Sequence, residues 1–175
     1  MFIGIDPGSK GFITVLSESG YSFLAIADSD PQQISSFLHT ASMDQFALRC
    51  GMICCMEEVH ALFGSSAKST FAFGRIFGFL IGVLTAFRIP YELVPPKVWQ
   101  KEIWNGYDKV TVTKKSTIKG KEYVRHEIDT KRTSYNAARR IFPDIDLRRK
   151  TSCTVFDDNK VDSLLICEYA RRRNL

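Results

Sequence analysis

The sequence has few of the residues that bind transition metals or cross-link small secreted domains. Only 3 of its 175 residues are histidine, and its 5 cysteines are odd in number. The cysteines lack the paired spacing of a zinc site, and no signal peptide precedes them. We therefore expect reduced thiols that mostly fill the core of an intracellular protein. The cysteines are Cys50, Cys54, Cys55, Cys153 and Cys167.

Long hydrophobic segments and internal repeats are also absent. The longest apolar run extends from Ile76 to Phe87 and is preceded by Arg75. A helix needs about 20 apolar residues to cross about 30 Å of hydrocarbon, so this run is too short to do so. We expect a soluble protein with no membrane partner.

The composition indicates one globular domain that covers residues 1–175. Hydrophobic residues make up 45% of the chain and aromatic residues 12%, which is enough to build a core. The net charge of +5 is unevenly distributed, because residues 109–150 contain 13 Lys and Arg against 5 Asp and Glu. A basic segment beside an acidic remainder suits a protein that holds phosphates with one surface and metal ions with another.

The pattern of apolar residues predicts an α/β fold. Strands are expected at 2–6, 11–16, 21–27, 52–57 and 91–94, and helices at 31–41, 70–87, from Pro95 onward, 130–141 and 158–172. Ser29 or Asp30 is expected to cap the first helix, and Thr130 the helix that it begins. Three meander strands followed by alternating helices and strands indicate an RNase H-like mixed β-sheet with helices on both faces. The polar, basic stretch at 105–129 is expected to form a hairpin or a mobile insertion.

Four acids stand where this fold could bring them together. Asp6 ends the first strand, Glu57 ends a buried strand, and Asp158 and Asp162 project from one face of the last helix. Acids that border a core are costly unless a basic group or a cation pairs with them. Oxygen ligands favour Mg²⁺, with Mn²⁺ as a substitute, and two such ions can activate water against a phosphodiester. We predict that these acids are catalytic and bind two ions.

Three adjacent residues compete for the position of the fourth metal ligand. Around an ideal helix, Asp158 lies about 40° from the line of Asp162, Asn159 about 60° on the other side, and Asp157 about 140° away. A hard cation prefers a charged carboxylate to a neutral amide, which favours Asp158. In the alternative interpretation, Asp158 only caps the helix.

Several stretches resemble the RuvC-type Holliday-junction resolvases, particularly the short phage-encoded members. The matching stretches are Gly4–Gly8 with Gly11, Met56–His60, Phe73–Arg75 with Gly78 and Gly82, Tyr91–Pro95 with Trp99, Lys131 through Pro143, and Asp158–Ile166. The resemblance implies an RNase H-like fold in which Asp6, Glu57, Asp158 and Asp162 bind two metal ions. It also implies a homodimer that acts on four-way DNA junctions. Some members space the last two acids by three residues, which would select Asn159, and the 105–129 stretch has no clear counterpart.

Glycines recur at Gly74, Gly78 and Gly82 within an apolar helix. Because each helical glycine costs about 1 kcal/mol relative to alanine, the stripe implies a close approach by another element. In one interpretation that element is the sheet of the same chain. In the other, Gly74 and Gly78 belong to the interface of a homodimer.

The loop that follows Glu57 also has two interpretations. It is either an ordinary surface loop or a segment that probes the junction, with His60, Phe63 and Lys68 contacting DNA. The basic region is predicted to bind DNA through Lys114, Lys115, Lys131, Arg132 and Arg139.

The function that best fits these features is a Mg²⁺-dependent, structure-selective endonuclease that cuts four-way DNA junctions as a homodimer. One alternative is a nuclease of the same fold that acts on other branched DNA or on RNA. Another is a junction-binding protein that does not cut, although such a protein would gain nothing from four acids near DNA phosphates. A sugar-kinase-like ATPase is disfavoured because that fold needs a second, duplicated domain.

Overall fold

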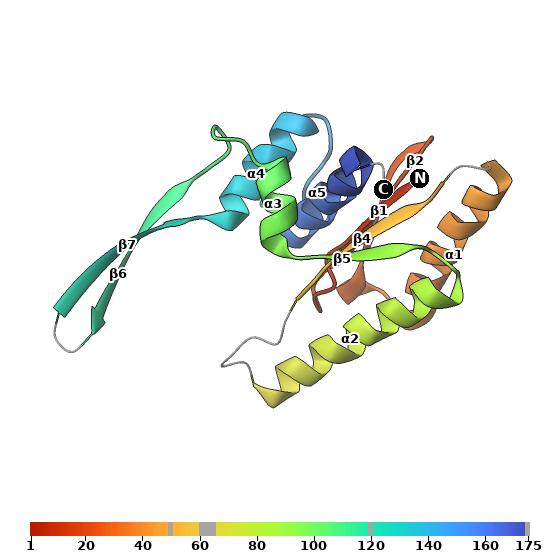
Figure 1. Cartoon of the computed structure of the whole chain (residues 1–175), viewed down its shortest axis with the longest axis horizontal. Coiled ribbons are helices and arrows are strands. Elements are labelled where there is room, and N and C mark those ends of the chain that lie inside the picture. The colour runs from red at the N-terminus through yellow and green to blue at the C-terminus, as the bar shows by residue number, and fades with distance from the viewer. Residues whose placement is uncertain (49–50, 60–65, 119–120, 174–175) are drawn as a thin grey trace.

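A mixed five-stranded sheet forms the centre of the chain. The computed structural model describes residues 1–48, 51–59, 66–118 and 121–173 (Figure 1). The strand order is β3-β2-β1-β4-β5. β1 pairs antiparallel with β2 and parallel with β4, β2 pairs antiparallel with β3, and β4 pairs parallel with β5. The bounds are Phe2–Ile5 for β1, Phe12–Ser17 for β2, Gly20–Ala25 for β3, Ile53–Glu57 for β4 and Tyr91–Val94 for β5.

Helices cover both faces of this sheet, as the sequence predicts. They are η1 (Ile26–Asp28), α1 (Pro31–Leu48), α2 (Ala67–Ala86), α3 (Pro96–Ile103), α4 (Thr130–Ile141) and α5 (Asp158–Arg173). Because successive side chains of a strand point to opposite faces of the sheet, the core has one part on each face. Ile3 and Ile5 pack with α1 and α2, whereas Cys55 of the neighbouring strand packs with α3, α4 and α5. Odd positions of β4 and even positions of β1 therefore face the α5 side.

Gly4 allows α5 to lie directly on β1. A Cβ atom at this position would come within 2.2 Å of both the Ser163 carbonyl oxygen and the Cys167 amide nitrogen. The helix is further tied to the sheet by a hydrogen bond of 2.8 Å between the hydroxyls of Ser163 and Thr14. Since Cys167 also donates its thiol to the carbonyl of Phe2, α5 runs antiparallel to β1. The first turn of α5 therefore lies at the end of the sheet where β1 ends.

Several element boundaries differ from those expected. The third strand stops at Ala25, and α1 extends to Leu48 rather than to residue 41. Asp30 caps α1 together with Gln33, in a reciprocal pair of hydrogen bonds of 2.8 and 2.9 Å. Asp129, not the expected Thr130, caps α4 by accepting the Arg132 amide. At the starts of α1 and α4 the acid, not the neighbouring hydroxyl residue, satisfies the first free amides.

The 105–129 stretch forms the predicted hairpin, from β6 (Thr111–Ile118) and β7 (Lys121–Ile128). The two strands pair with each other in a separate two-stranded sheet, and Figure 1 shows them extending away from the rest of the chain. The base of the hairpin is fixed to α4. Arg140 holds the buried carboxylate of Asp108 in two hydrogen bonds of 2.7 and 3.0 Å, and Val110 donates its amide to Thr133.

α2 is an apolar helix that the described chain leaves mostly uncovered. It is the one helix among the described residues that is long and apolar enough to suit a membrane, and 17% of its apolar window is buried. A single such helix is weak evidence for a membrane span. Cβ atoms at Gly74, Gly78 and Gly82 would meet no described atom within 4 Å. The interpretation that this stripe lets α2 approach its own sheet closely is therefore wrong.

Candidate active site

Asp6 and Glu57 lie side by side at one edge of the sheet. Ile5 of β1 pairs with Met56 of the parallel strand β4, so the next residue on each strand is one of the two acids. Both acids occupy the alternation positions that face α3 and α5. Asp6 is buried, and its Oδ1 atom accepts the Gly8 amide at 3.2 Å.

The turn after β1 is held tightly around the backbone of Asp6. Asp6 donates its amide to the Phe12 carbonyl at 3.0 Å, and Gly11 donates to Gly8 at 2.8 Å. A Cβ atom at Gly11 would lie 2.0 Å from the Asp6 carbonyl oxygen, so only glycine fits there. The Asp6-Pro7-Gly8 turn with Gly11 thus has a structural cause, which is to place one carboxylate at the strand end.

The first two turns of α5 bring Asp158 and Asp162 to the same edge. Asp162 immediately precedes Ser163, one of the residues that contacts Gly4 of β1. Its Oδ1 atom is buried and has no hydrogen-bond partner in the described chain. Asp158 is the first residue of α5 and forms an ion pair with Lys131 of α4. The structure therefore gathers all four predicted acids at one end of the sheet.

Asp157, not Asp158, caps α5. Its Oδ1 atom accepts the amides of Asn159 and Lys160 at 3.0 and 3.2 Å, and its Oδ2 atom accepts from Arg149 at 2.6 Å. Although burial alone would raise the pKa of Asp157, these hydrogen bonds lower it below its ordinary value. The amide side chain of Asn159 is also turned toward Asp157, at 3.3 Å. The alternative in which Asp158 serves only as the cap is therefore wrong.

The electrostatics of the cluster favour neutralisation of its acids. Burial, followed by repulsion from Glu57 and then from Asp158 and Asp157, raises the pKa of Asp6 to about 7. Burial also raises the pKa of Glu57. The pKa of Asp162 is raised well above its ordinary range by burial and by Asp6, Glu57 and Asp158, although a hydrogen bond from Ser134 opposes this. Three raised pKa values at one edge are typical of a functional site that awaits a cation.

Glu57 has a partner that the sequence does not reveal. The indole N–H of Trp99, on α3, donates to its Oε1 atom at 3.0 Å, and this hydrogen bond partly offsets the effect of burial on the pKa of Glu57. The ion pair between Asp158 and Lys131 is a second contact that the sequence does not reveal, and it raises the pKa of Lys131. Both contacts depend on how α3 and α4 dock beside α5, and no local pattern encodes that docking.

The donor set fits a hard divalent cation, although the acids are not arranged around one. Among the described residues, no group of three or more His, Cys, Asp or Glu side chains could hold a metal ion as placed. Glu57 and Asp158 point toward side chains of other helices instead, Glu57 toward Trp99 and Asp158 toward Lys131. The buried, unpartnered Oδ1 atom of Asp162 is an oxygen that a cation would satisfy. The cluster contains only oxygen donors, which is the chemistry that Mg²⁺ and Mn²⁺ prefer.

The residues predicted to bind DNA fall into three groups. His60 and Phe63 lie outside the described residues. Lys68 lies in the first turn of α2 rather than in a loop, because that helix begins at Ala67. The others lie on the hairpin and on α4, namely Lys114, Lys115, Lys131, Arg132 and Arg139.

Several of these cations already have partners within the chain. Lys114 pairs with Glu127 at 2.7 Å, Arg132 lies 3.8 Å from Asp129, and Arg139 donates to the Pro143 carbonyl. The cations that follow α4 are also paired: Arg148 with Asp146, Arg149 with Asp157 and Lys150 with Asp28. The segment between α4 and α5 is thus held by ion pairs, and Lys131 of α4 is the cation that pairs directly with one of the four acids.

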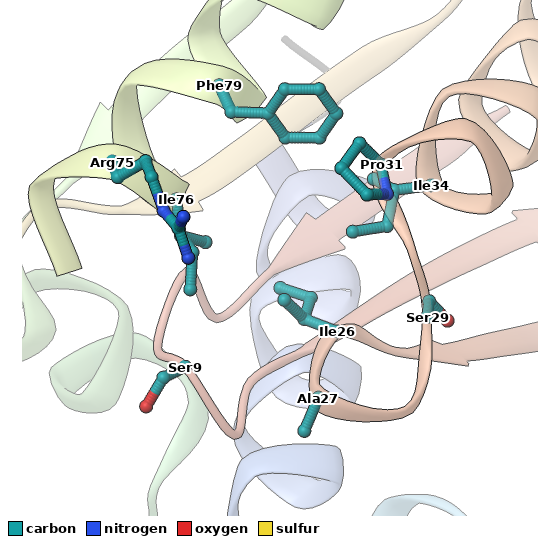
Figure 2. Close-up of a pocket in the computed structure, with 9 residues that line it drawn as sticks. All are labelled: Ser9, Ile26, Ala27, Ser29, Pro31, Ile34, Arg75, Ile76 and Phe79. Carbon is teal, nitrogen blue, oxygen red and sulfur yellow. The ribbon is translucent and has the colours of Figure 1, made fainter. Parts of the chain in front are cut away.

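A separate pocket of about 560 Å³ lies between α1, α2 and the turn after β1. Figure 2 shows it lined by Ser9, Ile26, Ala27, Ser29, Pro31, Ile34, Arg75, Ile76 and Phe79. None of the four acids lines this pocket, and its walls are mainly apolar. The candidate active site, at the end of the sheet where β1 and β4 end, is therefore separate from this pocket.

Solved structures of RuvC from Thermus thermophilus share this fold. RuvC in complex with a Holliday-junction substrate matches with a TM-score of 0.53 and 11% sequence identity, over 98% of this chain and 94% of that chain. A second Thermus thermophilus RuvC structure matches with a TM-score of 0.51 and 13% identity, over 98% and 95%. No protein-family model and no curated protein matches the sequence. The structural matches confirm the predicted RNase H-like fold of RuvC type.

Proposed function

We propose that this chain, which has the RuvC-type RNase H-like fold, is a metal-dependent endonuclease that cuts four-way DNA junctions. The observation that carries the proposal is the cluster of Asp6, Glu57, Asp158 and Asp162 at one end of the sheet. Such a cluster costs folding free energy unless a cation neutralises it. A cluster of acids that carries this cost favours a catalytic role over a structural one.

These four acids are the residues that would hold the metal ions. Two divalent cations at such a site supply Lewis acidity, which activates water and stabilises the leaving oxygen of a phosphodiester. Asp6 is fixed by the Gly8 amide and Glu57 by Trp99, so two of the oxygen donors are oriented before any cation arrives. Lys131 is held beside the cluster by Asp158 and would be available to a DNA phosphate once Asp158 turns toward a metal.

The DNA surface in this proposal comprises α4 and the hairpin β6–β7. Lys131 and Arg132 lie in the first turn of α4, next to Asp158 and at the base of the hairpin. Lys114 and Lys115 lie farther out, on β6. A duplex arm that leaves the cluster past the first turn of α4 would therefore meet the hairpin. The Holliday junction bound by the Thermus thermophilus RuvC structure supports a branched substrate.

We also propose that two copies associate through α2. Cβ atoms on its glycine stripe at Gly74, Gly78 and Gly82 would meet none of the described atoms within 4 Å, and Phe71 beside the stripe is 75% exposed. A second copy packed on this stripe would bury apolar surface that the single chain leaves uncovered. Twofold symmetry would then place two clusters of acids on the two opposed strands of a junction, as paired cuts require.

A cleavage assay on matched substrates tests this function. The substrates are a synthetic four-way junction, a three-way branch, a linear duplex and an RNA–DNA hybrid, each with Mg²⁺ or with a chelator. We expect Mg²⁺-dependent cutting of the four-way junction in preference to the others. Preferential cutting of the three-way branch or the hybrid would instead favour a related nuclease of the same fold. Tight junction binding without cutting in Mg²⁺ or Mn²⁺ would favour a binding protein.

A further inference from the structure

The two tryptophans of the chain lie close together but differ in what their indole N–H groups contact. Trp99 is fully buried on α3 and donates to Oε1 of Glu57 at 3.0 Å. Trp104 follows the end of α3, and its ring meets that of Trp99 edge-on, with 6.1 Å between the centroids. Its Nε1 atom is buried without a hydrogen-bond partner among the described residues. One tryptophan is thus bonded to the acid cluster, and its neighbour is not.

We propose that Trp99 is a positioning residue, whose indole N–H fixes one oxygen of Glu57 so that the other faces the divalent cation. This inference rests on the proposed function, because it assigns a role toward the metal ions that the function requires. A free glutamate side chain must lose rotamer freedom when it binds a metal. A hydrogen bond from a buried ring removes much of that cost in advance, and outer-shell partners of this kind orient metal ligands in many proteins.

The surroundings of Trp99 explain why its ring can serve as a fixed support. The ring packs in the core with Val94 and Ile103 on one side of the sheet, together with residues of α4 and α5. α3 begins at Pro96, directly after β5, the strand that pairs with β4. The donor and the acceptor therefore lie on adjacent strand–helix units of one sheet, and their separation is set by the core.

The indole N–H of Trp99 differs from the ammonium group of Lys131 because it is uncharged. Lys131 binds Asp158 through a full positive charge, which a divalent cation must displace. An indole N–H carries no net charge, so it orients Glu57 without competing electrostatically with a cation at the second oxygen. One acid is thus held by a charged lysine and another by a neutral donor.

The experiment compares Trp99→Phe with the matched control Trp104→Phe. Each variant removes one buried indole N–H, but only the first removes a hydrogen bond to Glu57. Titration calorimetry with Mn²⁺ on the DNA-free protein measures binding independently of cleavage. We expect Trp99→Phe to weaken Mn²⁺ binding about tenfold, the lower end of the range for outer-shell changes, and Trp104→Phe to change it less than about twofold. Equal affinity in the two variants would overturn the proposal.

A second measurement separates positioning from general loosening of the fold. In a Glu57→Gln background, Trp99→Phe should cause no further loss of Mn²⁺ affinity, because the ligand that it positions is already gone. A tenfold further loss there would mean that Trp99 acts on the site as a whole, and the proposal would be wrong. Failure of the otherwise unaltered protein to bind Mn²⁺ at all, or undiminished binding by Asp162→Asn, would instead refute the proposed function, and the role of Trp99 with it.

Fluorescence keeps the proposal testable if Trp99→Phe does not fold. In Trp104→Phe, Trp99 is the only tryptophan, since the sequence contains two. Paramagnetic Mn²⁺ held by Glu57 should quench its emission, and Glu57→Gln should abolish most of that quenching. Quenching that is the same in both proteins would contradict the assignment of Trp99 to Glu57.

Discussion

Asp158 at the start of α5 forms an ion pair with Lys131 in the first turn of α4, although 27 positions separate them in the sequence. This pair joins the first turn of α4 to the acid cluster. The adjacent Asp157 faces elsewhere, because it caps α5 and binds Arg149. Two neighbouring acids in one sequence motif thus have separable structural roles.

The first prediction follows from the different roles of Asp158 and Asp157. Asp158→Asn should abolish cutting with little change in the free energy of unfolding, because an exposed ion pair contributes at most about 1 kcal/mol. Asp157→Ala should cost about 1 kcal/mol or more through the lost cap, yet retain cutting while the protein is folded. Urea denaturation and initial cleavage rates check the two outcomes. Normal cutting by Asp158→Asn, with loss in Asp157→Ala or Asn159→Ala, would mean that the fourth ligand is misassigned.

The second prediction concerns pH and the metal-free protein. The folded state keeps a proton on Asp6 up to about pH 7, whereas the unfolded chain loses it near the ordinary pKa of 3.8. Glu57 and Asp162 are shifted in the same direction. Folding therefore takes up protons in this range, and the free energy of unfolding should fall as pH rises from about 4 to about 7.

Denaturant unfolding in a chelator at pH 5 and pH 8 measures this effect. The wild-type protein should be less stable at pH 8, and Asp6→Asn should lose part of that difference, at about 1.4 kcal/mol per pKa unit removed. Acids with lowered pKa values, such as Asp108, titrate below this window and do not contribute to it. Mg²⁺ should restore stability at pH 8. Equal stability of the metal-free protein at both pH values would show that folding does not raise the pKa values of the acids in the cluster.

The third prediction concerns the dimer. Gly78→Glu places a charge on the stripe of α2 where the single chain leaves open space, so the protomer should still fold. Light scattering at micromolar concentration should give the mass of two chains for the wild type and of one chain for this variant. Val155→Glu, at another exposed apolar position (66% exposed), is the control and should remain dimeric. A wild-type protein that is monomeric both free and on DNA would exclude the α2 interface.

The fourth prediction concerns the hairpin. Lys115 is exposed on β6, and Lys115→Gln should weaken junction binding and reduce the slope of log affinity against log salt by about 0.9, as expected for one lost phosphate contact. Arg173→Gln removes an equal charge at the far end of α5 and should leave the slope unchanged. Fluorescence anisotropy at several salt concentrations provides the comparison. Matching slopes for the two variants would remove Lys115 from the DNA surface.

The sequence predicts the sheet and the four acids because both follow from local patterns. The end of each apolar run marks the end of a strand. Parallel pairing of β1 with β4 then places Asp6 beside Glu57. Helical geometry likewise relates Asp158 to Asp162. The observed fold and the gathering of the acids agree with this reasoning, while their metal-binding role remains a prediction.

Other features depend on docking and could not be predicted. The face of α2 that packs on the sheet determines whether its glycines are covered. Apolar residues cover most of the circumference of this helix, so their pattern does not identify that face. The bond between Trp99 and Glu57 requires α3 to pack beside β4. Asp129 and Thr130 both suit a helix start, and only the backbone conformation at Asp129 decides between them.

The most direct measurement follows a synthetic four-way junction, labelled on each strand in turn, with wild type and Asp162→Asn. The account predicts that wild type with Mg²⁺ makes paired nicks at symmetric positions on opposed strands near the junction centre. Asp162→Asn should make none, yet bind the junction equally or more tightly, because it loses a ligand and a charge that repels phosphate. Near-normal Mg²⁺-dependent nicking by Asp162→Asn, or no nicking by wild type bound to the junction, would contradict the account.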